Sequence, residues 1–255
     1  MVDRLMAAAG STRVIDVELT RSEVRLSVVS GQTAQTYAWR DNQISQIDSD
    51  ITYVGQTIFD PRSCALNDLG SLFSQAAAIA GSSANQQLQI VDYDNGNIYM
   101  NVTTNPETLP VFFTTTGVLV RPLNPANLAD LAQELAQVVS PHEDVVRLGI
   151  SDNGSVYADL AAGTDQVMRV VRASRFPVRD QLRSDSTHVL AFDSDLVTAD
   201  DIEAILTRAS AHLDKPLSGG FSLTIERSPN QPAPLASVTI AGKTSRLTLE
   251  AVVLN

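Results

Sequence analysis

The sequence predicts an α+β fold made of four tandem modules, each with one helix followed by three or four antiparallel strands, arranged as two homologous halves, 1–122 and 123–255. Two observations support this prediction. Segments with helical spacing of apolar residues precede blocks of short segments in which apolar and polar residues alternate. In addition, residue patterns recur along the chain at a nearly constant offset, as expected after a tandem duplication.

The duplication rests on matching residues about 132 positions apart. Phe59-Asp60 and Phe192-Asp193 lie 133 residues apart. Nine residues after each Phe comes an Asp followed by an apolar residue, first at Asp68 and then at Asp201. Matches at this offset extend over more than 100 residues, which is why we expect two halves with the same order of elements.

Three segments carry a helical pattern: 65–80, 127–139 and 198–213. Asn127 and Thr198 stand where an N-cap is expected. Acidic residues follow Thr198 at once, where they suit the helix dipole. The partner of the second helix falls at the start of the chain, where only Val2–Ala9 is available. We therefore expect the chain to begin part-way into a module, as an excised ectodomain would; the alternative is that this helix is simply short.

Short alternating segments follow each helix and predict the strands. Asp94-Asn95-Gly96 and Asp152-Asn153-Gly154 separate two pairs of them, and Asn-Gly between alternating segments predicts a β-hairpin. Connectors 50–55 and 187–192 can each supply an extra strand. The expected strands are 13–19, 23–29, 35–40 and 43–47, then 87–93, 97–103 and 110–115, then 145–151, 155–160 and 166–172, and finally 221–226, 236–241 and 245–253.

The composition excludes several classes of protein. With 44% hydrophobic and 18% charged residues, the chain is globular and not disordered. Its net charge of −11 argues against general binding to nucleic acid, because Lys and Arg supply most of that affinity. No apolar run approaches the roughly 20 residues that span a bilayer. The single cysteine excludes a disulfide framework and a cysteine-rich zinc site.

The sequence predicts no enzyme, no catalytic residues, no metal site and no cofactor. It has neither Gly-x-Ser-x-Gly nor Ser-x-x-Lys, and its three histidines, His142, His188 and His212, stand apart. Asp92–Asn97 has the residues of a hairpin turn and lacks the closing glutamate of a calcium loop.

Five arginines gather within fifteen residues of this acidic chain and form the candidate binding patch. Arginine forks suit carboxylates and other anions, so the cluster can form a contact surface for an anionic partner. The other interpretation is an edge strand whose charges prevent aggregation. The five are Arg169, Arg172, Arg175, Arg179 and Arg183.

Tyr37 and Trp39 alternate on one face of a predicted strand. Exposed aromatic side chains of this kind can anchor an interface. Packing inside the core of one sheet is the other interpretation.

The order of modules resembles, in architecture, the tandem helix-plus-antiparallel-sheet repeats of PepSY-type and beta-lactamase-inhibitor-type proteins. The resemblance implies a secreted or envelope-associated protein that acts by binding and not by catalysis, and it designates no residue. We therefore expect an extracytoplasmic or membrane-anchored binding protein whose partner is a protein or an anionic envelope polymer. A cytoplasmic location is the alternative, and so is a carrier that holds a small molecule or lipid between sheet and helices.

Overall fold

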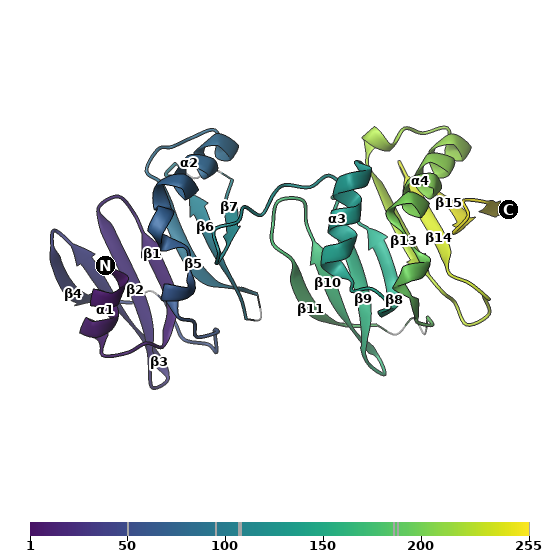
Figure 1. Ribbon diagram of the computed structural model, residues 1–255. Coiled ribbons are helices and arrows are strands. Elements are labelled where there is room, and N and C mark those ends of the chain that lie inside the picture. Colours follow the sequence, from purple (N-terminus) through teal and green to yellow (C-terminus); the bar gives the residue numbers. More distant parts are fainter. Residues whose placement is uncertain (50, 95, 107–108, 186, 188, 255) are drawn as a thin grey trace. The chain divides into compact units, whose positions relative to one another are not determined.

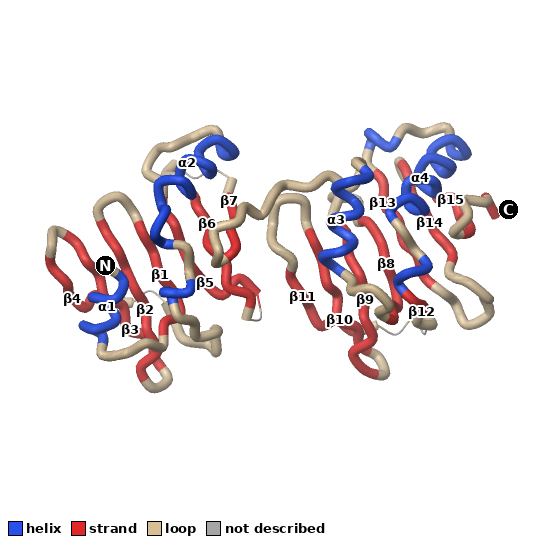
Figure 2. The backbone as a smooth tube through the Cα atoms, viewed as in Figure 1, coloured by secondary structure: helices blue, strands red, loops and turns tan. Residues whose placement is uncertain are grey.

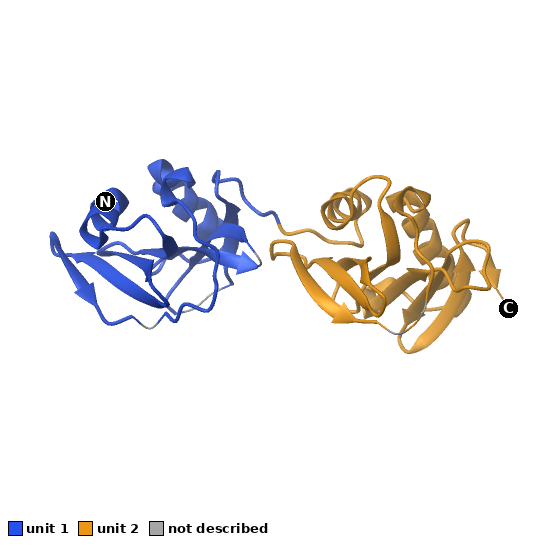
Figure 3. Cartoon of the chain, turned by 90° about the horizontal axis from the view of Figure 1, so that it is seen from below, with its two compact units in different colours: residues 1–121 blue, residues 122–255 orange. Residues whose placement is uncertain are grey.

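The computed structural model describes residues 1–49, 51–94, 96–106, 109–185, 187 and 189–254 (Figure 1). Over these residues the fold is α+β, with four α-helices and two antiparallel sheets, which confirms the predicted α+β class and its antiparallel strands. The chain divides into two compact units, Met1–Arg121 and Pro122–Asn255 (Figure 3). In both units the helices lie on one face of the sheet, and the other face carries no helix (Figure 3).

Unit 1 has a seven-stranded sheet in the order β4-β3-β2-β1-β5-β6-β7. Helix α1 packs on β2 and β3, and α2 packs on β6 and β7. The antiparallel pairing of β1 with β5 makes one continuous sheet from the strands that follow the two helices (Figure 2). The elements are α1 (Val2–Ala9), β1 (Val14–Leu19), β2 (Glu23–Ser30), β3 (Thr33–Arg40), β4 (Gln43–Ile47), α2 (Leu69–Ala80), β5 (Gln87–Asp94), β6 (Asn97–Thr103) and β7 (Val111–Thr114).

Unit 2 repeats this arrangement with a sheet in the order β11-β10-β9-β8-β13-β14-β15-β16, and β12 pairs with β8. Helix α3 packs on β9 and β10, and α4 packs on β14 and β15. The elements are α3 (Leu128–Val138), β8 (Asp144–Ile150), β9 (Val156–Gly163), β10 (Gln166–Arg172), β11 (Arg179–Ser184), β12 (Phe192–Asp193), α4 (Ala199–Leu213), β13 (Phe221–Glu226), β14 (Leu235–Ile240), β15 (Lys243–Thr248) and β16 (Val253–Leu254).

The helix caps explain where the helices begin. The Asn127 side chain accepts from the backbone N–H of Asp130, and Thr198 and Asp201 form a reciprocal capping box. The helix predicted over 65–80 begins only at Leu69, because the Asp68 side chain caps it there and a 3₁₀ turn occupies Leu66–Asp68.

The strand predictions need three corrections. Strand β11 was not predicted, because its sequence has one apolar residue and no alternation. The strand expected over 245–253 is two strands, separated by a turn in which Ala251 has a φ of 58°. The connector after β11 pairs with the sheet at β12 and through an isolated bridge between Leu190 and Arg227, and in unit 1 Phe59 makes an isolated bridge to Val14. Asp50 of the first connector lies outside the described residues.

Each unit has its core between helices and sheet. Tyr37 and Trp39 of β3 are half-buried and pack against the apolar cluster of unit 1, next to α1. They are therefore core residues of that unit and not exposed interface anchors. No helix among the described residues is long and apolar enough to cross a membrane.

Candidate functional site

A row of polar side chains crosses the helix-free face of unit 2. Successive cross-strand neighbours share a face of a sheet. The register places five such neighbours side by side, one from each of five strands. They are Gln181 of β11, Arg169 of β10, Asp159 of β9, Arg147 of β8 and Glu226 of β13.

Asp159 lies between two arginines and has no exposed surface. Its Oδ1 accepts from Arg169 Nε at 2.6 Å, and its Oδ2 accepts from an Arg147 terminal nitrogen at 2.9 Å. Hydrogen bonding to Asp159 raises the pKa of the Arg169 guanidinium. Burial alone would lower the pKa of Arg147, but hydrogen bonds to Glu226 and Asp159 outweigh it and raise that pKa. Both arginines therefore stay charged.

Arg147 also holds the connector that follows β11. Its guanidinium donates to Asp185 Oδ2 at 3.1 Å and to the Thr187 hydroxyl at 3.0 Å. The Thr187 N–H donates to Asp185 Oδ1, and hydrogen bonds from Thr187 hold the pKa of Asp185 below its ordinary value. A single arginine thus ties β8, β9, β13 and the connector together.

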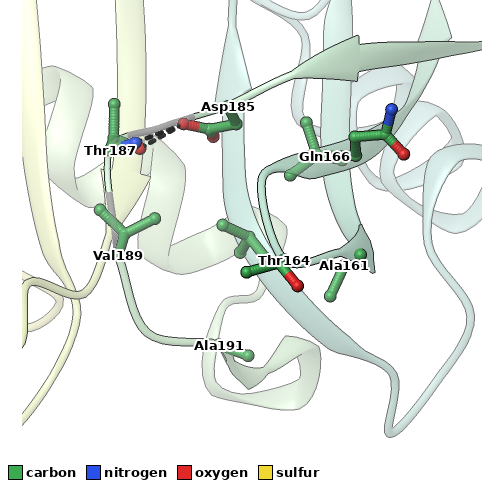
Figure 4. Close-up of a pocket in the computed structure, with 10 residues that line it drawn as sticks. Ala161, Thr164, Gln166, Asp185, Thr187, Val189 and Ala191 are labelled. Atoms are coloured by element: carbon green, nitrogen blue, oxygen red, sulfur yellow. Dashed lines mark hydrogen bonds between the residues drawn. The ribbon is translucent and has the colours of Figure 1, made fainter.

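A cleft of about 170 Å³ lies between this connector and the β9–β10 hairpin (Figure 4). Its lining combines apolar side chains with a polar rim. The rim opens into a recess lined only by polar residues, from Thr164 to Gln166 and at Ser184 and Asp185. Sites for drug-sized ligands are mostly apolar and have about 300–1,000 Å³. The cleft is smaller than that range. It is lined by Val146, Ala161, Gly163, Thr164, Gln166, Val167, Asp185, Thr187, Val189 and Ala191.

Tyr157 braces the same face. Its ring lies under the Arg169 guanidinium, with 4.0 Å from the guanidinium carbon to the ring centroid. Its hydroxyl reaches Thr224 at 3.4 Å, across Gly149 of the strand between them. A Cβ at Gly149 would lie 2.3 Å from the Leu223 carbonyl oxygen of the neighbouring strand and 2.7 Å from the Tyr157 hydroxyl, so only glycine fits here.

The five arginines of the predicted patch do not form one surface. Arg169 belongs to the internal cluster, and Arg172 is 1% exposed. Arg175 is half-buried in the loop between β10 and β11. Of the five arginines, only Arg179 and Arg183 are exposed, and both lie on β11. The prediction of a single patch was wrong because alternation along β10 turns Arg172 toward α3, onto the face opposite Arg169.

Arg172 lies against α3. Its Nε donates to Gln137 Oε1 at 2.8 Å, and one terminal nitrogen contacts the carbonyls of Ala173 and Phe176. Glu134 of α3 is also fully buried, and neither of its carboxylate oxygens has a hydrogen-bond partner among the described residues. Burial raises the pKa of Glu134 to about 7, although the Arg172 charge opposes this shift.

β11 is the outermost strand of its sheet and is exposed along nearly its whole length. Arg179, Gln181 and Arg183 point to the helix-free face, as the register with β10 requires. Leu182 points to the other face and is 52% exposed. No described residue forms an ion pair with Arg179 or Arg183.

His142 and His212, the two histidines that the structure describes, do not gather into a catalytic arrangement. His142 Nδ1 lies 2.6 Å from Asp195 Oδ2, and Asp193 is close by. This pairing was missed because the two segments are about 50 residues apart. The side chains of His142, Asp193 and Asp195 are all exposed, and the hydrogen bond between His142 and Asp195 explains why these three residues lie close together. His212 lies in the last turn of α4, and His188 lies outside the described residues.

No family model matches the chain, and no curated protein matches it. Solved structures with some similarity are sliding clamps. The DNA polymerase III β subunit of Thermotoga maritima is 7% identical, with a TM-score of 0.19, over 93% of this chain and 56% of that one. The sliding clamp of Pseudomonas aeruginosa is 10% identical, with a TM-score of 0.19, over 95% of this chain and 58% of that one. The β clamp of Helicobacter pylori bound to a DNA ligase peptide is 11% identical, with a TM-score of 0.18, over 98% of this chain and 63% of that one. The chain thus spans about three fifths of their length, and at these TM-scores the likeness carries no argument about function.

Proposed function

We propose that this chain is a non-catalytic protein-binding module in which β11 accepts an extended segment of a partner as an added strand. The observation that carries the proposal is the outer edge of β11. An outermost strand presents unpaired backbone N–H and C=O groups, and such edges bind extended segments by strand addition. Here both faces of the edge strand are open as well.

The other long edge strand, β4 in unit 1, is a weaker candidate. Its Ile44 packs against the core of unit 1, and Ile47 is half-buried. β11 makes no comparable contact with the core of unit 2, since its single apolar residue is largely exposed. The connector at the end of β11 is tied to the sheet by Arg147, which keeps the edge in place without covering it.

The internal charges of unit 2 support a binding role over a catalytic one. Catalytic acids and bases need a proton that can be exchanged with a substrate. Asp159, Arg147 and Arg169 instead satisfy one another beneath the surface. The carrier alternative has less support, because apolar side chains pack the interior of both units and the cleft under the connector is small. The recess beside that cleft has about 470 Å³, but no apolar side chain lines it.

We also propose that the two halves of the chain are copies of one ancestral half, each with two helix-plus-strand modules. The support is that both units carry polar side chains at matching positions of the helix-free face. An extracytoplasmic location stays a prediction, and fractionation of cells that express the full gene would test it.

Selection of nine-residue peptides from a random display library tests the binding role. We expect selected peptides to slow amide hydrogen exchange in β11 and to lose binding when every second backbone amide is N-methylated, because strand addition uses those groups. Exchange in β4 of the same protein serves as the control. Peptides that protect β4 or α4 instead, or that tolerate N-methylation, would contradict the proposal.

A further inference from the structure

We propose that the segment bound by β11 is acidic, with two carboxylates four residues apart on the helix-free face, one opposite Arg179 and one opposite Arg183. This inference rests on the proposed function, since it assigns the chemistry of the segment that the edge accepts.

The inner neighbours of the two arginines show why they are available. Across the ladder to β10, Arg179 lies beside Val171 and Arg183 lies beside Val167. Valine offers no charge, so neither arginine has a counter-ion on its inner side. Only the outer side can supply one, and directly opposed residues of opposite charge stabilise a strand pair.

Gln181, which lies between the two arginines on the same face, has a cation as its inner neighbour. Gln181 lies beside Arg169, whose guanidinium is already bound by Asp159. A third carboxylate opposite Gln181 would have no free cation to meet. Arg179, Gln181 and Arg183 therefore favour a partner segment with an acidic, a neutral and an acidic residue at every second position. At about 3.4 Å per residue, the two carboxylates of that segment are roughly 13 Å apart.

The other face of the edge adds an apolar preference. Leu182 is half-exposed and its inner neighbour is Met168. A partner residue opposite Leu182 extends this apolar pair outward. The expected segment thus alternates, with carboxylates toward the helix-free face and at least one apolar side chain toward the helix side.

Charge exchange tests the inference better than salt does. The chain carries a net charge of −11, so salt screens the general repulsion of an acidic peptide together with its attraction to the two arginines. We would use a nine-residue peptide with Glu at positions three and seven, Val at four and six, and Thr elsewhere, a pattern that serves either strand direction. Two matched peptides carry Gln or Lys in place of Glu.

On the wild-type chain we expect the Glu peptide to bind about tenfold more tightly than the Gln peptide, with the Lys peptide weakest, as two exposed cross-strand ion pairs allow. The double variant Arg179→Glu/Arg183→Glu should reverse this order. The matched control is Arg208→Glu, which changes an exposed arginine on α4 of the same unit and should leave the order unchanged. Thermal unfolding checks that the variants fold.

Each outcome decides one of the two proposals. Equal binding of the Glu and Gln peptides to β11 overturns the acidic preference and leaves strand addition standing. Reversal of the order by Arg208→Glu also overturns it, because the effect would then follow total charge. If no peptide slows exchange in β11 at millimolar concentration, strand addition itself fails, and the inference fails with it.

Discussion

The helix-free faces of the two units have polar residues at the same three ladder positions, but the chemistry differs. In unit 2 the positions hold Arg147, Asp159 and Arg169. In unit 1 the corresponding strands β1, β2 and β3 place Asp16, Ser27 and Thr36 side by side. All three residues of unit 1 are nearly fully buried.

Both rows hold the connector that crosses from one module to the next. In unit 1 the Ser27 and Thr36 hydroxyls share a hydrogen bond of 2.8 Å, and Thr36 donates to the Ser49 hydroxyl of the connector at 2.9 Å. In unit 2 Arg147 reaches Asp185 and Thr187 of the connector. Each connector covers a small cleft, of about 190 Å³ in unit 1 and 170 Å³ in unit 2.

Both units thus hold their connector against the helix-free face, unit 1 through hydroxyl groups and unit 2 through ion pairs. The two solutions differ in what they risk. Loss of one hydroxyl leaves neutral groups with modest desolvation costs, whereas loss of the central carboxylate leaves buried cations facing each other.

The largest expected effect comes from removing that carboxylate. Asp159→Ala should destabilise unit 2 by about 3 to 5 kcal/mol, because Arg147 and Arg169 then repel each other under the connector. Amide hydrogen exchange in β8 to β10 measures the loss. The single tryptophan, Trp39, lies in unit 1 and reports that unit by fluorescence, so its unfolding transition should not move. A loss below 1 kcal/mol would show that the ion network adds little.

The next effect is a loss of stability of unit 2 as pH rises from 4.5 to 7. With the pKa of Glu134 at about 7 against an ordinary 4.5, the folded state keeps a proton that the unfolded state has released. Stability of unit 2 should therefore fall by about 3 kcal/mol as pH rises from 4.5 to 7, and stay level above that. α1 of unit 1 buries only Leu5 and Met6, and has no such group.

Glu134→Gln provides the control for that prediction. It keeps the size of the side chain and removes its titration, so the slope between pH 4.5 and 7 should disappear from hydrogen exchange in α3. A slope that persists in this variant would assign the pH dependence to another group.

A smaller loss of stability is expected at Gly149, a position where the two units again differ. Gly149 of β8 corresponds to Glu18 of β1, which points its carboxylate toward Arg25 at 3.7 Å. Gly149→Ala should cost about 1 to 3 kcal/mol, because the new methyl group meets the Leu223 backbone carbonyl as well as the Tyr157 ring. Thermal unfolding of this variant and of Gly149→Ala/Tyr157→Ala separates the two contacts, and we expect the double variant to recover only the part of the loss due to the ring. If the single variant is as stable as wild type, the site does not need the glycine.

The smallest expected effect is in unit 1. Ser27→Ala removes one buried hydrogen bond and should cost about 1 kcal/mol. The urea midpoint of Trp39 fluorescence measures it directly. A loss as large as that of Asp159→Ala would mean that the hydroxyl row is as critical as the ionic row, and would end the contrast between the two units.

The sequence was sufficient for features that depend on neighbours along the chain. The caps at Asn127 and Thr198 and the hairpin at Asn153-Gly154 are local, and the helices and strands form beside them. The internal ion network was not predictable. Glu226 reaches Arg147 from 79 residues away, and that contact exists only once the register of β8 with β13 is known.

The arginine patch shows the same limit in another form. Spacing along the chain placed five arginines together, but burial separates Arg172 from Arg179 and Arg183. Nothing in the one-dimensional pattern marks Asp159 as the partner of Arg169, because a fully buried carboxylate runs against the hydrophobic pattern by which strands are recognised.

The pairing of β1 with β5 has a consequence for how the chain folds during synthesis. Asp16 pairs with Val91, so the central strand of unit 1 finds its neighbour only after 75 further residues. At translation rates of about 5–20 residues per second the first strands wait roughly 4 to 15 s with an open central edge. Such long-range pairing raises the contact order and slows folding. The same delay recurs in unit 2, where β8 awaits β13.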